Sequence, residues 1–253
     1  MKHSKAMQFF NIIYPVFLYF TVTVAVLYLI DGFWPQTRAY KLFQQLLTSL
    51  AVLPMLYVMY RDKNTKKTVR KKQPLYLAAV MFVTGACFAV AWNTFLGMIK
   101  IEEYSASYGQ VAQTFYNGKL FLEIFALCIV IPIVEELLYR GIVFKRSADF
   151  LGNRPAILLS AVIFGLVHMN LVQFIYASVF GILLAYITDL TGTLTGAVAA
   201  HMAANLTSVL SAEKEMFSFL DNGTVVKIQT MVILFGISAV GIWTVYKINS
   251  DKI

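Results

Sequence analysis

Long apolar windows, separated by short charged or turn-rich breaks, run through the whole chain. Several windows contain about 20 residues without a charge, the length that a helix needs to cross a hydrocarbon core of roughly 30 Å. Helix-stopping residues such as Gly32, Pro74, Pro155 and Gly192 lie in the breaks. The pattern predicts an all-α, polytopic transmembrane helix bundle with about eight transmembrane helices.

The expected helices follow the apolar windows. They cover residues 9–30, 40–60, 74–99, 119–143, 155–170, 172–190, 194–210 and 228–246. We divide the chain into three N-terminal spans within 1–118, a core of 119–210, and an external loop with the last span in 211–253. The first apolar stretch is too long for the apolar region of a signal peptide, so we expect it to remain as a membrane helix.

Composition and charge exclude several classes of protein. The chain is 59% hydrophobic and 13% charged, whereas a soluble domain is roughly a quarter charged. The net charge of +8 comes mainly from loops, and the densest basic loop, 61–73, contains no aromatic residue. We therefore expect no nucleic-acid partner. The two cysteines, Cys87 and Cys128, lie inside apolar windows and predict neither a disulfide framework nor a C-x-x-C site.

The distribution of basic residues predicts an orientation in the membrane. With the N-terminus inside, loop 61–73 and most of the other lysines and arginines fall on the same side. Cytoplasmic loops carry this excess of lysine and arginine. We expect a multi-pass protein of the cell membrane with both termini in the cytoplasm.

A few polar residues interrupt the later windows, and each is costly to expose to lipid. Glu136 and Arg140 are four residues apart, which places them on one helix face where they can pair. Glu135 points about 100° away and has no basic residue three or four positions from it. It is the carboxylate left free for proton transfer. His201 and Asn205 share a face in the same way. A purely structural charge network is the alternative interpretation.

Three short motifs, in order across 119–210, carry a resemblance to a known family. They are Glu135-Glu136-x-x-x-Arg140, Phe164-x-x-x-His168 and His201-x-x-x-Asn205. The set resembles the CPBP family, which comprises CAAX-protease and bacteriocin-processing membrane proteins. The first 118 residues carry no motif of the family.

The resemblance implies an intramembrane endopeptidase acting on a membrane-embedded peptide or protein. By analogy, Glu135 and His168 would activate a water molecule. His201 and Asn205 would donate hydrogen bonds to the oxyanion. Glu136, Arg140 and Phe164 would hold the site in place.

The family is often classed as metalloproteases, and Glu135, His168 and His201 are the candidate zinc ligands. We favour a site without a cofactor, because the chain lacks His-Glu-x-x-His and because using Glu135 as a ligand would remove the best base. Two other functions stay open. One is a non-catalytic protein of bacteriocin self-immunity, and the other is a small proton-coupled transporter, although no inverted repeat supports it.

Overall fold

The computed structural model describes residues 4–32, 38–61, 73–105 and 119–250, and this part of the chain contains helices and no strand. The all-α prediction is confirmed. The α-helices are α1 (Lys5–Ile30), α2 (Arg38–Tyr60), α3 (Leu75–Met98), α5 (Leu120–Glu123), α6 (Ile131–Glu136), α7 (Lys145–Leu151), α8 (Asn153–Leu166), α9 (Leu171–Thr191), α10 (Thr195–Lys214) and α11 (Thr224–Ser250). Two π-helical segments are η2 (Ile124–Val130) and η3 (Leu137–Phe144), and two 3₁₀ segments are η1 (Ile101–Tyr104) and η4 (Ser218–Asn222).

Among the described residues, five helices are long and apolar enough to cross a membrane, namely α1, α2, α3, α9 and α11. The shortest of these spans has 21 residues, which extend about 30 Å at a rise of 1.5 Å per residue. Helix α8 is apolar but has only 14 residues. The protein is therefore a multi-pass membrane protein whose remaining helices are shorter, more polar or interrupted.

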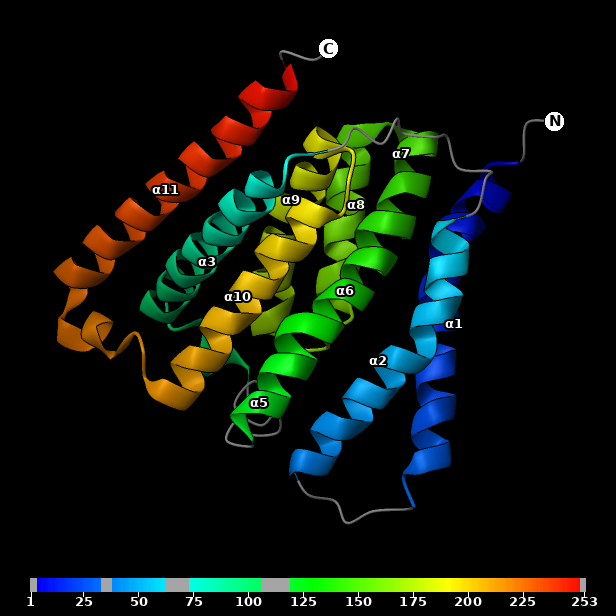
Figure 1. Ribbon diagram of the computed structural model, residues 1–253, viewed down its shortest axis with the longest axis horizontal. Helices are drawn as coiled ribbons and strands as arrows, with labels where there is room; N and C mark the ends of the chain where they lie inside the picture. Colours follow the sequence, from blue (N-terminus) through cyan, green and yellow to red (C-terminus); the bar gives the residue numbers. More distant parts are fainter. Residues whose placement is uncertain (1–3, 33–37, 62–72, 106–118, 251–253) are drawn as a thin grey trace.

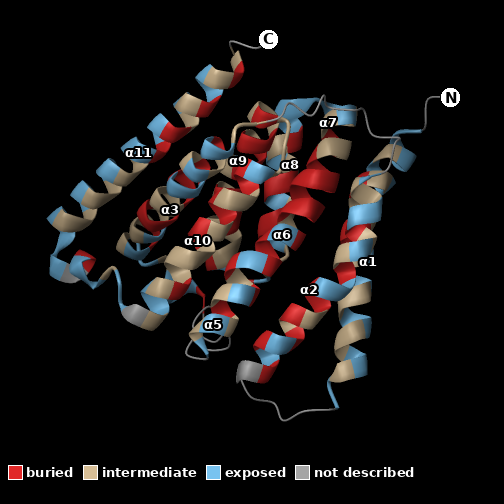
Figure 2. Cartoon of the chain, viewed as in Figure 1, coloured by how far each residue is buried: buried red, intermediate tan, exposed pale blue. Residues whose placement is uncertain are grey.

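Helices α6, α8, α9 and α10 form the centre of the bundle (Figure 1). Helices α1 and α2 pack together on one flank, and α3 and α11 pack together on the other. Helix α1 begins and α11 ends at the same end of the bundle, which we call the terminal end. Buried residues gather on the central helices, whereas α1 and α11 are largely exposed (Figure 2). The centre is thus where a polar site can be kept away from lipid.

The helix predicted over 119–143 is longer than expected. Helical structure continues without a break from Leu120 to Leu151, through η2, α6, η3 and α7. It ends at Gly152, which has a φ of +83°. Gly141 does not end it, because this glycine is a packing position: a Cβ there would lie 2.9 Å from Tyr60 Cδ2.

The helix predicted over 155–170 is shorter than expected. Helix α8 ends at Leu166, and residues 167–170 form a turn before α9. Two local features make this turn. Met169 has a φ of +59°, and the Asn170 side chain accepts a hydrogen bond from Gln173 N at 2.9 Å, which caps α9. His168 therefore lies beyond the helix that was expected to carry it.

Small residues let α3 and α10 approach closely. A Cβ on Gly85 of α3 would lie 2.2 Å from the carbonyl oxygen of Ala200 on α10. Residues 192–200 are rich in glycine and alanine, and small side chains let helix backbones meet in lipid. Since Ala200 precedes His201, this contact fixes the part of α10 that carries the site.

Candidate active site

Glu136 and Arg140 form a fully buried ion pair. Arg140 Nη1 donates to Glu136 Oε1 at 2.8 Å, and both side chains are 0% exposed. Arg140 Nη2 also donates to the carbonyl oxygen of Gly181 on α9, at 3.2 Å. The pairing predicted from the four-residue spacing is present. It links α6 and η3 to α9, because the guanidinium has donors left after it binds the carboxylate.

His201 on α10 binds the same carboxylate oxygen. Its Nδ1 lies 2.8 Å from Glu136 Oε1, which already accepts from Arg140. A carboxylate oxygen in this position acts as an acceptor, so the geometry assigns a proton to His201 Nδ1. Glu136 therefore fixes the orientation of the imidazole ring, in addition to neutralising Arg140. Sequence reasoning missed this contact, which joins residues 65 positions apart.

Glu135 faces the other nitrogen of the same ring. Its Oε2 lies 3.6 Å from His201 Nε2, a distance beyond a direct hydrogen bond but within the range of an ion pair. The Glu135 side chain is 19% exposed, whereas that of Glu136 is fully buried. The two adjacent glutamates thus hold opposite edges of one imidazole, and Glu135 is the accessible one.

Aromatic rings enclose His201. Phe164 of α8 and Phe180 of α9 contact its ring edge to face, at centroid distances of 5.7 and 5.8 Å. The Arg140 guanidinium lies 4.4 Å from the centroid of the same Phe164 ring. These apolar walls keep water away from the Glu136–Arg140 pair, and the cation–π contact offsets part of the cost of burying the guanidinium.

His168 reaches this region from the turn after α8. Its Nδ1 lies 2.8 Å from the Phe164 carbonyl oxygen, so Nδ1 carries the proton and Nε2 is an acceptor. The His168 ring packs edge to face against the Phe164 ring, with the two centroids 5.1 Å apart. The same Phe164 ring also contacts His201. Among the described residues, His168 forms no hydrogen bond or ion pair with Glu135. Phe164 therefore contacts the rings of both histidines.

Asn205 already has one partner. Its Nδ2 donates to the carbonyl oxygen of Leu127 in η2, at 2.7 Å. A π-helical segment leaves its carbonyls with altered hydrogen bonding, so a side-chain donor from α10 is a natural partner here. The amide nitrogen of Asn205 keeps a second hydrogen, but its position is set by η2. No motif in the sequence indicates this contact.

The geometry also tests the zinc ligands considered from the sequence. A catalytic zinc takes three protein ligands. Within the described residues, no group of three histidine, cysteine or acidic side chains is arranged to hold a metal ion. Glu135, His168 and His201 as arranged do not fit a zinc site, and no step below uses a metal.

Gly181 is a second residue that sequence reasoning missed. A Cβ at this position would lie 3.1 Å from Arg140 Nη2 and 3.1 Å from Ala161 Cα. The glycine therefore makes room for the guanidinium between α8 and α9. The only signal in the sequence is a glycine within an apolar window, which by itself does not indicate a partner.

Part of the chain is similar to a known protein family. Residues 117–207 match the family model described as "Type II CAAX prenyl endopeptidase Rce1-like". This segment contains all three motifs and all the site residues described above. Comparisons with curated proteins and with solved structures gave no significant match. Over this segment, the chain is similar to the CAAX-protease (CPBP) family of intramembrane proteases.

Proposed function

We propose that this protein is an intramembrane endopeptidase that hydrolyses a peptide bond of a membrane-associated peptide or protein. The observation that carries the proposal is the pair of contacts on His201. Glu136 orients the ring through Nδ1, and the more accessible Glu135 faces Nε2 at 3.6 Å. An accessible carboxylate beside an oriented imidazole, in surroundings that are mostly apolar, suits acid–base chemistry on a bound water.

In the proposed reaction, Glu135 takes a proton from water, assisted by the free Nε2 of His168. The hydroxide adds to the carbonyl carbon of the substrate and forms a tetrahedral intermediate. Glu135 then returns the proton to the amide nitrogen, and the carbon–nitrogen bond breaks. The products are a carboxylic acid and an amine, so no electrons or protons remain unaccounted for.

His201 and Asn205 are proposed to stabilise the oxyanion of that intermediate. In this role His201 donates from Nε2, the ring nitrogen that faces Glu135. Asn205 donates the amide hydrogen that Leu127 does not use. A single donor of this kind contributes about 10²–10³ to the rate. Both donors lie on α10, so they move together.

The experiment compares the wild type with Glu135→Gln in the native membrane. The change keeps the shape of the side chain but removes its ability to accept a proton, so cleavage should fall about 10²–10⁴-fold. Newly formed peptide termini in the membrane and secreted fractions are quantified by mass spectrometry. Membrane abundance should stay near that of the wild type, because Glu135 is not part of the buried pair.

Glu102→Gln is the matched control, since Glu102 is an exposed residue of η1 outside the matched segment. It should leave every cleavage product unchanged. If Glu135→Gln formed the same products at the same rate as the wild type, the proposed base would be wrong. If Glu135→Gln retained an immunity phenotype without any product, a non-catalytic role would replace the proposal.

A further inference from the structure

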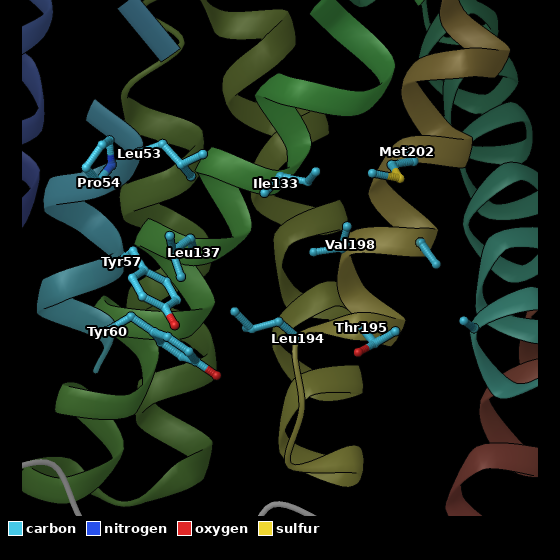
Figure 3. A pocket seen from close by; sticks show the side chains of 12 residues that line it. Leu53, Pro54, Tyr57, Tyr60, Ile133, Leu137, Leu194, Thr195, Val198 and Met202 are labelled. Atoms are coloured by element: carbon cyan, nitrogen blue, oxygen red, sulfur yellow. The ribbon is translucent and has the colours of Figure 1, made fainter. Parts of the chain in front are cut away.

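An apolar groove lies between α2 and α10, with α6 and η3 as its floor (Figure 3). Its volume is about 780 Å³. The floor is formed by Ile133 and Leu137, and the α10 wall by residues such as Val198 and Met202. The side chains that line it are apolar except for three hydroxyl-bearing ones, Tyr57, Tyr60 and Thr195.

The groove is not the candidate active site. Residues two apart on a helix point about 200° away from each other. Glu135 is two residues from both Ile133 and Leu137, so it faces away from the groove floor. A molecule in the groove therefore lies on the other side of α6 from the accessible carboxylate. The groove is thus expected to bind something other than the peptide bond that is cleaved.

Two cations lie at the terminal end of the groove, each against one of its tyrosines. Lys145 Nζ lies 4.4 Å from the ring centroid of Tyr60. Arg61 Nη1 donates to the Tyr57 hydroxyl at 3.5 Å, and its guanidinium carbon lies 5.9 Å from that ring. Among the described residues, neither cation has a carboxylate partner. This end of the groove is positive and also has phenolic donors.

The volume of the groove suits a single lipid acyl chain better than a partner helix. A helix about 10 Å in diameter occupies roughly 400 Å³ per turn, so the groove holds less than two turns of a partner helix. A hydrocarbon chain of the length found in membrane lipids needs about 500 Å³, if each carbon takes about the volume of a water molecule. One such chain fits within the groove, and the two cations suit an anionic group at its end.

We propose that this groove binds an anionic phospholipid, with one acyl chain between α2 and α10 and the phosphate beside Arg61 and Lys145. Tyr57 and Tyr60, which these two cations contact, line the same part of the groove. A basic residue near an anionic lipid contributes about a five-fold preference, so the two together give about 25-fold over a zwitterionic lipid. The bound chain fills the space between the helix that carries Glu135 and the flanking α2.

The test is native mass spectrometry of the full chain in detergent, with equal amounts of phosphatidylglycerol and phosphatidylcholine. The wild type should retain phosphatidylglycerol about 25-fold more than phosphatidylcholine. Arg61→Gln with Lys145→Gln should reduce that preference at least five-fold. Ala199→Phe, which fills the groove from α10, should reduce the retention of both lipids.

Two controls match these changes. Arg154→Gln with Lys247→Gln removes the same charge from α8 and α11, which do not line the groove. Val232→Phe adds bulk to an exposed position of α11. Both should bind lipid as the wild type does. Thermal unfolding of each variant confirms that it is folded.

Equal retention of the two lipids by the wild type would overturn the proposal. So would an equal loss of preference in the two doubly substituted proteins, because the charge effect would then not be local to the groove. If Ala199→Phe blocked substrate cleavage and left lipid retention unchanged, the groove would hold a part of the substrate and the phospholipid assignment would be wrong.

Discussion

Glu136 contacts His201 as well as the arginine that its spacing predicts as a partner. The motif suggested a structural partner of Arg140, but the carboxylate also accepts from His201 Nδ1. We infer that Glu136 is a positioning residue, because it acts on the reaction only through the ring that it holds. A group with this role affects both stability and activity. The two effects can be separated by also replacing Arg140, the other partner of Glu136.

Glu136→Gln should lower both the stability and the activity of the protein. It leaves the Arg140 guanidinium buried without a counter-charge, which costs about 3–5 kcal/mol. Adding Arg140→Met removes that orphan charge and should recover much of the lost stability. Cleavage should not recover, because His201 still lacks its anionic acceptor. Apparent melting temperature in detergent and product formation measure the two effects.

The two readouts distinguish a positioning residue from a structural one. A purely structural Glu136 predicts that cleavage returns together with the melting temperature in the doubly substituted protein. Recovery of both would therefore contradict the positioning role. Glu136→Asp is a complementary test, because it keeps the charge but shortens the side chain that reaches His201. Cleavage should therefore fall strongly, while the melting temperature should fall only slightly.

At the scale of elements, the site depends on how closely α10 approaches its neighbours. Gly85 of α3 touches the backbone of Ala200, and Asn205 binds the carbonyl of Leu127 in η2. These two contacts lie on either side of His201 along α10. They set the position of α10 along its axis and its rotation about that axis. The distances from His201 to both glutamates depend on these two quantities.

Gly85→Ala should disturb this arrangement. The added Cβ would lie 2.2 Å from the Ala200 carbonyl oxygen, so the two backbones must move apart. We expect a loss of stability of about 1–3 kcal/mol, typical of overpacking, and slower cleavage per folded molecule. Gly97→Ala is the control in the same helix, because a Cβ there meets nothing within 4 Å. Equal effects of the two substitutions would exclude a specific contact between α3 and α10.

At the scale of the whole molecule, the two ends of the described chain lie at the same end of the bundle. Arg61, Lys145 and Arg146 lie there as well, and Arg146 donates to the Asn11 carbonyl of α1 at 2.9 Å. The positive-inside rule therefore still predicts that this end faces the cytoplasm. This orientation would place the groove cations beside the anionic lipids of the inner leaflet.

Reporter fusions test the orientation. A fluorescent protein that folds in the cytoplasm should be bright when fused after Ile253, and alkaline phosphatase should be inactive there. Alkaline phosphatase inserted after Asn222, in the connection before α11, should be active. The opposite result at both positions would reverse the predicted topology while leaving the bundle itself unchanged.

The sequence by itself determined the features that depend on local chemistry. Apolar windows of sufficient length predict membrane helices, because backbone polar groups in lipid must be satisfied within each span. The Glu136–Arg140 pair follows from spacing on one helix. Helix ends were less predictable: a positive φ at Met169 and a cap at Asn170 end α8 early and leave His168 in a turn.

Only the tertiary structure decided which residues meet from different helices. The contacts of His201 with both glutamates, of Asn205 with Leu127 and of Arg140 with Gly181 join distant parts of the chain. Each depends on the rotation, tilt and spacing of packed helices. Those quantities arise from the sum of many side-chain contacts, and a motif of four or five residues does not contain them.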